Sequence, residues 1–445
     1  MARLPIDLED DVPCALCDDG PLTDPTVVVR SRRKVLRDIA ALGGAAMGAP
    51  LLLPGIAVAA TPTRRRTLVC VFLRGGLDGL ATVVPLDDGD LAAARPDLLV
   101  EEALPLAGPV GLHPAAAPLA ELFDDGRLGV LRAVGLADPV RSHFSAQHQV
   151  ETAGGGATSG WLARLVAART PEPGALAAVA IGPRVTPSLS GGPAVALADV
   201  ADPSLGLPAG VTDPSDLLRM LTTSQPTVAA PGAVAALDAV AALQEAGVAG
   251  VPRGDGYPSS GLGEGLSQVA RMLRADVPVE VACVDAGGFD LHAGLADRQP
   301  VLLDDLARSL AAFAADLGPR LDDVLVLAVS EFGRRVHQNG TGGTDHGRGG
   351  VALVLGGGVV GGIHGAWPGL AAAALDRPRD DAPEGDVAVT TDVRDLLGDV
   401  VQATAVPEDP AVAQVLGVVL PAHEYRPTGV VDVAPLEPAE VGADV

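Results

Sequence analysis

Carboxylate and imidazole side chains recur along this chain in short glycine-rich segments, a combination typical of metal sites. The clearest case is "GGTDHGRGG", in which Asp345 and His346 are adjacent and flanked by glycines. Glycine lets the backbone fold closely around an ion, so both side chains could be directed at one cation. Mixed carboxylate and imidazole ligands favour zinc, manganese or iron over calcium, which prefers oxygen ligands alone.

Similar residues follow other apolar segments of the chain. Asp78 lies in "RGGLDGL", Asp290 and His292 lie in "DAGGFDLH", and His364 lies in "GGIHGAWPG". Together these donors could hold two divalent metal ions, zinc or manganese. Two ions about 4 Å apart can bind the attacking and departing oxygens of an in-line displacement.

Ser142, in "RSHFSAQH", is the candidate nucleophile. A serine beside a divalent cation can attack without a His-Asp relay, because the metal lowers the pKa of its hydroxyl. The alternative is a helix N-cap, a position at which serine is common.

The other candidates also have simpler explanations. A lone aspartate in a glycine-rich loop, such as Asp78, is usually a turn residue. His364 could belong to a strand-end loop, and His143 and His148 could be surface histidines on the helix after Ser142. The hypothesis of a metal site therefore depends on all these residues meeting in space.

The elements that would bring them together are short runs that are apolar at every position. Such runs are typical of strands in a parallel sheet covered on both faces. Leucines at helical spacing between residues 302 and 317 predict a crossover helix. We expect an α/β, doubly wound, mostly parallel central sheet with helices on both faces, whose ligands bind at the carboxyl ends of the strands. The predicted strands are 68–73, 128–134, 177–181, 279–284, 324–329 and 351–355.

The domain organisation follows from the same patterns. Residues 1–60 form an acidic leader and a signal segment, and residues 61–425 form the α/β domain. Helical pieces separated by Pro- and Gly-rich joints predict an insertion at about residues 200–275, and residues 426–445 form a C-terminal tail.

The signal segment, "SRRKVLRDIAALGGAAMGAPLLLPGIAVAA", begins with Arg32 and Arg33 and ends in small residues. This pattern predicts export of the folded protein by the twin-arginine machinery to the periplasm, the cell envelope or the medium. The alternative is an uncleaved membrane anchor, because about 20 apolar residues can span a bilayer. Two glycines and two prolines weaken that alternative, and no stable span is expected after signal removal.

Composition excludes some functions. The net charge of -25 and the pI near 4.5 argue against partners such as nucleic acid or an anionic membrane, which need a basic surface. Cys14 and Cys17 form a C-x-x-C that lacks the second pair of a zinc site. Cys70 and Cys283 lie in apolar runs and are expected to be buried thiols.

Several segments together resemble a known family. They are "LVCVFLRGGLDGLATVVP", "GLHPAAAPLAELF", "RSHFSAQ", "DAGGFDLH", "SEFGRR", "GGTDHGRGG" and "HGAWPGL", spread over residues 66–420. In this order after a twin-arginine signal, they resemble the domain of unknown function 1501 family. That family is similar to the alkaline phosphatase and sulfatase superfamily, whose members have a parallel-sheet α/β core and two bound metals.

The resemblance implies roles for the candidates. Asp78 matches the ligand after the first strand, Ser142 matches the nucleophile at the start of a helix, and Asp345 and His346 match the pair that completes the same metal site.

The resemblance assigns the second ion to Asp290, His292 and His364. Related enzymes commonly space this Asp and His by four residues, whereas Asp290 and His292 are two apart. Asp285 is therefore an alternative ligand.

Other residues bear on the substrate. The chain has no C/S-x-P-x-R pattern around Ser142, which disfavours a formylglycine sulfatase. Arg141 could bind an anionic ester or form a surface salt bridge. Glu331 and Arg334 could orient the ligands or form a structural ion pair.

The predicted function is an exported, metal-dependent hydrolase of phosphate or related esters, acting on a small molecule or an envelope ester. The alternative is a noncatalytic secreted protein that keeps the fold and binds a metal or an envelope component. A third possibility is an enzyme that acts on sugar or sulfonate esters in the envelope.

Overall fold

The computed structural model describes most of the chain after residue 64. Short strands β1 (Leu52–Leu53) and β2 (Ile56–Ala57) form an antiparallel pair. The rest of the predicted signal segment, the C-x-x-C and part of the predicted insertion lie outside the described residues. The main described ranges are 65–170, 172–202, 230–377, 385–405 and 412–432.

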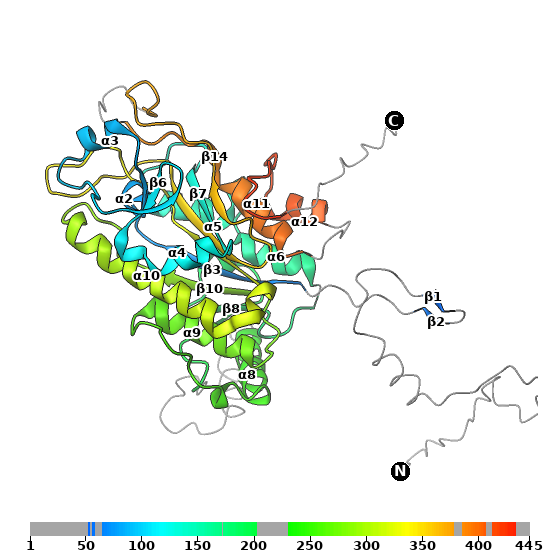
Figure 1. Ribbon diagram of the computed structural model, residues 1–445. Helices are drawn as coiled ribbons and strands as arrows, with labels where there is room; N and C mark the ends of the chain where they lie inside the picture. The colour runs from blue at the N-terminus through cyan, green and yellow to red at the C-terminus, as the bar shows by residue number, and fades with distance from the viewer. Residues whose placement is uncertain are drawn as a thin grey trace, which may run out of the picture. The chain divides into compact units, whose positions relative to one another are not determined.

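A nine-stranded sheet forms the centre of the described part of the chain (Figure 1). Each predicted strand matches an observed one, and all pairs are parallel except those of β12, which is antiparallel to both neighbours. The mostly parallel sheet is therefore confirmed. Its order is β13 (Gly362–His364), β7 (Leu128–Gly135), β12 (Gly350–Gly356), β11 (Val324–Val329), β3 (Thr67–Leu73), β10 (Val281–Ala286), β8 (Ala178–Ile181) and β9 (Val195–Leu197), and β14 (Thr391–Asp392) also pairs with β7.

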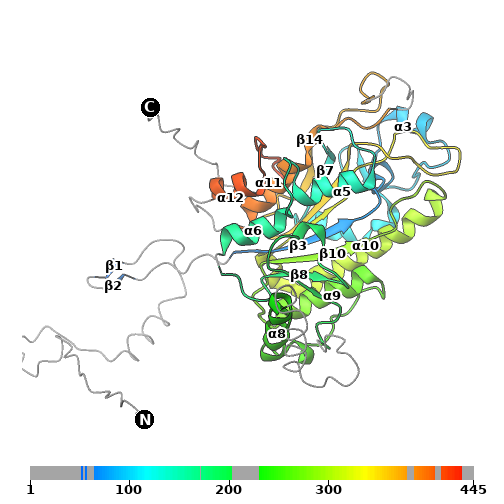
Figure 2. The ribbon, with the colours of Figure 1, turned by 180° about the vertical axis from the view of Figure 1, so that it is seen from behind.

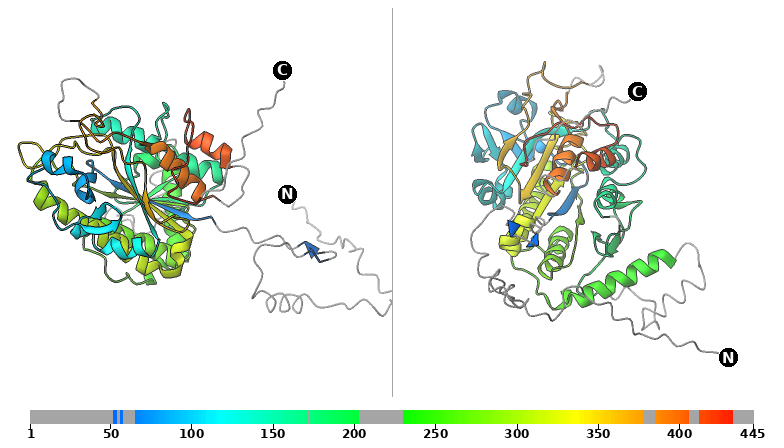
Figure 3. Two further views of the ribbon diagram at one scale, coloured as in Figure 1. Left: turned by 45° about the horizontal axis from the view of Figure 1, so that its top comes forward. Right: turned by 90° about the vertical axis from the view of Figure 1, so that its right-hand side faces the viewer.

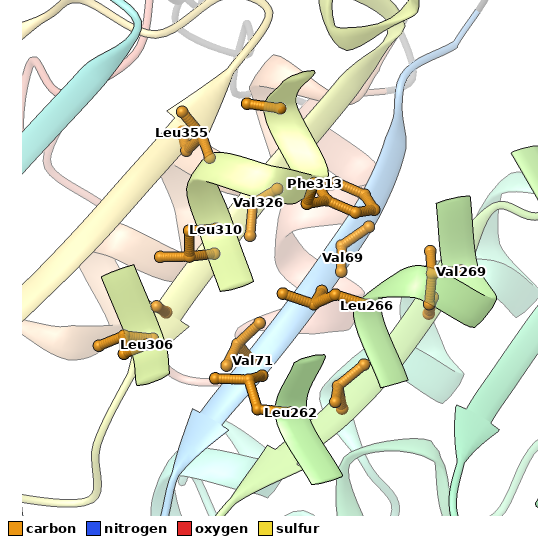
Figure 4. Close-up of a cluster of buried hydrophobic side chains, with 14 of the residues drawn as sticks. Val69, Val71, Leu262, Leu266, Val269, Leu306, Leu310, Phe313, Val326 and Leu355 are labelled. Atoms are coloured by element: carbon orange, nitrogen blue, oxygen red, sulfur yellow. The ribbon is translucent and has the colours of Figure 1, made fainter. Parts of the chain in front are cut away.

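The central strand β3, "TLVCVFL", shows why the apolar runs do not alternate. Leu68, Cys70 and Phe72 belong to one buried cluster, and Val69 and Val71 belong to another. Successive side chains of a strand point to opposite faces, so a strand covered on both faces needs apolar residues at every position. Figure 4 shows Val69 and Val71 among leucine and phenylalanine side chains of the neighbouring helices.

Helices cover both faces of the sheet, as predicted (Figures 1 and 2). One cluster joins a face of the sheet to α4 (Pro118–Asp124), α8 (Ala230–Glu245), α9 (Gly261–Arg274) and α10 (Leu295–Leu317). The other joins the opposite face to α5 (His143–Thr152), α6 (Trp161–Arg169), α11 (Val393–Ala403) and α12 (Val412–Val419).

Two of these helices bear on the sequence predictions. The predicted crossover helix is α10, which links β10 to β11. Helix α9 lies inside the predicted insertion, yet it packs against α10 and β10 and so belongs to the layer that covers the sheet. Figure 3 shows this layer from two further directions.

The remaining elements surround the sheet. A small antiparallel sheet has the order β4 (Val83–Pro85), β6 (Val110–Leu112) and β5 (Leu104–Ala107). The short helices are α2 (Gly79–Thr82), α3 (Gly89–Ala94), η1 (Pro114–Ala116), η2 (Pro187–Leu189), η3 (Val248–Gly250) and η4 (Gly318–Asp323).

The direction of β12 determines where its flanking loops lie. Because β12 is antiparallel to β11, the loop from residue 330 to 349 leaves and re-enters the sheet at the carboxyl edge of the parallel strands. The carboxyl end of β12 itself lies at the opposite edge. Residues just before β12 can therefore join a site at the carboxyl edge, and those just after it start on the other side.

The described residues also bear on the cysteines and the tail. Cys70 and Cys283 are free, buried thiols, as expected. Buried Asp399 on α11 accepts hydrogen bonds from Tyr425 and from the backbone N–H of Thr428, which attach the segment before residue 433 to the domain. None of the helices in the described ranges is both long and apolar enough to cross a membrane.

Candidate metal centre

Three histidines and one aspartate meet at the carboxyl edge of the sheet; we call them the His-Asp cluster. His143 is the first residue of α5, Asp290 and His292 follow β10, and His346 precedes β12. The Nε2 atoms of His292 and His346 lie 3.1 and 3.2 Å from Oδ1 of Asp290. Nε2 of His143 lies 3.4 Å from Oδ2 of the same carboxylate.

Each imidazole of the cluster is held by its other ring nitrogen. Nδ1 of His143 lies 2.8 Å from Oε1 of Glu331, and Nδ1 of His292 lies 2.8 Å from Oδ1 of Asp345. Nδ1 of His346 lies 2.8 Å from the carbonyl oxygen of Arg141. Ionised carboxylates and carbonyls only accept hydrogen bonds, so each Nδ1 carries a proton. In a neutral ring with this tautomer, Nε2 carries no proton and its lone pair is free to bind a cation.

These lone pairs lack ordinary partners. Nε2 of His292 and Nε2 of His346 are 2.9 Å apart, and a ring that is neutral with its proton on Nδ1 has none to place between them. Nε2 of His143 is buried without a hydrogen-bond partner among the described residues. Donor atoms of His143, Asp290 and His346 all lie within 4.8 Å of one another. A cation fits this arrangement, since imidazole and carboxylate are common ligands of zinc and manganese.

Glu331 fixes the orientation of His143. Its buried carboxylate accepts hydrogen bonds from the backbone N–H of Gly75 and from Nε2 of Gln147, each at 2.9 Å, as well as from His143. Burial raises the pKa of Glu331, but the hydrogen bonds from Gln147, His143 and Gly75 outweigh burial and lower it. Glu331 is therefore ionised and keeps the proton of His143 on Nδ1.

Gly75 must be a glycine at this position. Its φ is +117°, and a Cβ there would lie 2.4 Å from the backbone nitrogen of Asp290. The close approach of these two loops brings Glu331, bound to Gly75, next to the segment that carries Asp290.

Arg334 connects three loops beneath the cluster. Its buried guanidinium donates to the carbonyls of Gly76 and Thr344 at 2.8 Å and of Phe289 at 3.2 Å. It also donates to Oδ1 of Asp290 at 2.7 Å. The side chain therefore orients a cluster residue, which is one of the two roles considered for it.

The same contacts keep Asp290 ionised. Burial raises its pKa, but the hydrogen bond from Arg334 and the positive charge of that guanidinium outweigh burial and lower the pKa to about 2. Burial lowers the pKa of His346, which favours its neutral form. A charged carboxylate beside a neutral imidazole, here Asp290 beside His346, is the protonation state that metal binding requires.

Asp345 supports the cluster from outside. Its Oδ1 accepts hydrogen bonds from Nδ1 of His292 and, at 3.1 Å, from Nδ2 of Asn339. Nδ1 and Nε2 point away from each other on the ring, so Asp345 lies on the side of His292 away from Asp290. Its contacts are those of a residue that orients His292, whereas the sequence suggested a direct ligand.

The structure does not place Asp78 in the cluster. Asp78 is buried as the N-cap of α2, and its Oδ1 accepts from Arg95 at 2.8 Å and from the backbone N–H of Ala81 at 3.0 Å. Its Oδ2 accepts from the hydroxyl of Thr344 at 2.9 Å. The guanidinium of Arg95 already neutralises this carboxylate, so Asp78 forms a structural ion pair here. Removing either partner would leave an uncompensated buried charge, a costly change.

His364 also lies apart from the cluster. It is the last residue of β13, pairs in register with Leu131 of β7, and its Nε2 lies 2.7 Å from the carbonyl oxygen of Val360. The prediction assumed that the residues after the last apolar run would lie at the carboxyl edge. That assumption was wrong, because β12 is antiparallel and its carboxyl end lies at the opposite edge.

Asp285, the alternative ligand, is also engaged elsewhere. Its Oδ2 accepts a hydrogen bond from Nε of Arg74 at 2.8 Å. His143 is the cluster residue that sequence reasoning underrated. The signal was the position of His143 directly after the candidate nucleophile in "RSHFSAQH".

Ser142 is the N-cap of α5 and immediately precedes His143. Its side chain is exposed and makes no capping hydrogen bond, so the hydroxyl does not have the purely structural role of a cap. On its other side, Arg141 contributes the carbonyl that holds His346, and its guanidinium pairs with buried Asp386 at 2.5 Å. The salt bridge of Arg141 is therefore directed into the protein.

The fold and the site together define an α/β protein with a His-Asp cluster suited to a divalent cation. The chain belongs to the family described as protein of unknown function (DUF1501), whose model matches residues 131–400. That range contains Ser142 and the whole cluster. No curated protein matches the chain.

Two solved structures show distant similarity. One is a protein in the alkaline phosphatase superfamily from Vibrio parahaemolyticus, with 13% identity, coverage of 75% of this chain and 71% of that chain, and a TM-score of 0.31. The other is the PH0037 protein from Pyrococcus horikoshii, with 14% identity, coverage of 66% and 86%, and a TM-score of 0.28. Both TM-scores are low, and no conclusion about this chain follows from them.

Proposed function

We propose that the chain is a metal-dependent hydrolase of phosphate or related esters, with one divalent cation, zinc or manganese, held by the His-Asp cluster. The observation that supports this most is the convergence of three Nε2 atoms on Asp290. Lone pairs 2.9 Å apart on His292 and His346 repel unless a proton or cation lies between them. A divalent cation would satisfy both, together with the buried Nε2 of His143.

One ion, rather than the two predicted, fits the donors that lie together. Within the described ranges, His143, Asp290 and His346 form the group of three His, Cys, Asp or Glu residues whose donor atoms are close enough to share an ion. Two of the donors predicted for the two-metal arrangement, Asp78 and His364, have other partners.

The proposed reaction uses Ser142 as nucleophile. A bound cation would supply positive charge to an ester oxygen. Ser142 Oγ bonds to phosphorus as the ester P–O bond breaks, the serine proton passes to solvent, and the alcohol leaves with a proton taken from water. A second water then cleaves the serine-phosphoryl bond and restores the hydroxyl. The free backbone N–H groups at the start of α5 favour an anionic group at Ser142.

Metal content and turnover test the proposal together. The purified full-length chain is expected to bind about one zinc or manganese ion and to hydrolyse 4-nitrophenyl phosphate. Elemental analysis gives the first quantity and released 4-nitrophenol gives the second. Bound metal without turnover of phosphate or sulfate esters would support the noncatalytic metal-binding alternative. Absence of bound metal after zinc loading would overturn both.

We also propose that the chain is exported by the twin-arginine machinery, which carries folded proteins. The proposal is supported by Arg32, Arg33 and the apolar segment after them. Exchanging both arginines for lysine keeps the charge but removes the paired guanidinium groups. We expect the double variant to remain in the cytoplasm, as judged by cell fractionation and immunoblotting. Equal export of the variant and the parent chain would contradict the proposal.

A further inference from the structure

A second feature lies beside the His-Asp cluster at the same edge of the sheet. A cleft of about 760 Å³ opens where β3, β8 and β10 end, next to the start of α5. Gln147 lines it and also donates to Glu331, the residue that orients His143. Arg74 lines it as well and donates to Oε1 of Gln147 at 3.2 Å. Gln147, in the wall of the cleft, is therefore connected to His143 through a single residue, Glu331.

An exposed aromatic ring belongs to this cleft. Phe144 directly follows His143 on α5, lines the cleft, and is 88% exposed. Val185, also in the lining, is 37% exposed. A ring held at the start of a rigid helix offers a flat apolar face, and covering that face with a ligand would remove it from water.

The polar lining limits what such a ligand can be. Glu151, Glu264 and Asp285 contribute carboxylates, whereas Arg74 and Arg184 contribute guanidinium groups. Arg74 pairs with Glu151 and Asp285, and Glu264 pairs with Arg253. Most of these charges are therefore already compensated, and the lining offers no cluster of free cations to a second anionic group. A hydrocarbon chain would remove carboxylates from water without offering them hydrogen bonds. Hydroxyl groups suit the site, because they donate to carboxylates and accept from arginine and glutamine side chains.

We propose that this cleft binds a sugar ring, so that the substrate is an ester carried by a saccharide. The ring would stack its C–H face on Phe144 and direct its hydroxyl groups to Asp285, Glu264 and Gln268. The ester group would then lie toward Ser142, one residue away from His143. The assignment of the sugar as the substrate's alcohol rests on the proposed hydrolase function, but binding of the ring does not need turnover.

Binding by the full-length, zinc-loaded chain tests the inference without relying on catalysis. The probes are the methyl glycosides of glucose, galactose, mannose and N-acetylglucosamine, with benzyl alcohol as the aromatic competitor. We expect saturation-transfer NMR to show contact with the ring protons of at least one glycoside. Phe144→Ala should weaken its binding by about five- to tenfold, the effect of losing one stacked ring, and Phe144→Tyr should restore it. Val301→Ala, at a residue 67% exposed on α10, is the matched control and should bind like the parent chain.

The outcomes separate the cleft from the reaction. If a glycoside binds in a way that depends on Phe144 but the protein hydrolyses no ester, the result supports sugar binding in the cleft and contradicts the proposed hydrolase function. If the protein hydrolyses ethyl phosphate but binds no glycoside, the result contradicts sugar binding in the cleft and leaves the hydrolase function standing. Binding of benzyl alcohol but no glycoside, or glycoside binding unaffected by Phe144→Ala, also overturns the assignment.

Discussion

Replacing His346 by alanine is expected to weaken zinc binding by more than about 100-fold, because losses of that order follow even when outer partners of a metal site are removed. His346 is the central residue of the cluster: its Nε2 contacts both Asp290 at 3.2 Å and His292 at 2.9 Å. The side chain is 19% exposed, and its loss opens no large gap in the apolar core. The variant should therefore fold. Competition titration with a zinc chelator measures the change in affinity.

His364→Ala is the matched control for this prediction. His364 was also a predicted ligand from the sequence, but its ring contacts the carbonyl of Val360, away from the cluster. We expect the His364 variant to keep the affinity of the parent chain. Equal loss of zinc in both variants, or no loss in the His346 variant, would show that the cluster is not the metal centre.

The second large effect is expected from Ser142→Ala, which should reduce hydrolysis of 4-nitrophenyl phosphate by more than about a thousandfold while zinc content stays unchanged. The hydroxyl is exposed and makes no capping bond, so its removal should cost little stability. Steady-state kinetics together with elemental analysis of the same preparation measure both quantities.

Ser145→Ala provides a control on the same helix. Ser145 lies in the first turn of α5, is also exposed, and is separated from His143 by Phe144. We expect it to retain the activity of the parent chain. Full activity in the Ser142 variant would exclude the serine as nucleophile and would indicate attack by water instead.

The sheet could be predicted from sequence because its strands are apolar at every position. Strand direction could not, since an apolar run such as that of β12 looks the same in either direction. This limit affects the site directly. Both His346, just before β12, and His364, after it, have places that depend on that direction: because β12 is antiparallel, the residues before it lie at the carboxyl edge and those after it start at the other edge.

Some of the candidate site residues could also be placed from the sequence, and others could not. Asp290 and His292 follow the buried parallel strand β10, so their place at the carboxyl edge could be expected from the topology, whereas the place of His346 also needed the antiparallel direction of β12. The partner of Asp78 could not be expected, because Arg95 is 17 residues away at the C-cap of the short helix α3, and nothing in the sequence pairs the two. His143 was underrated because one histidine at the start of a helix resembles a surface residue until Glu331 is seen beneath it.

The hydrogen bonds of Arg334 have a consequence for how this site comes into being. One guanidinium joins carbonyls that follow β3 and β10 to a carbonyl that precedes β12. Each of these loops is held in part by its contact with Arg334, so the geometry of the His-Asp cluster depends on assembly of the whole edge. Affinity for the proposed cation would then report on the folded population of the protein, and export of the folded chain, as we propose, would carry the ion with it.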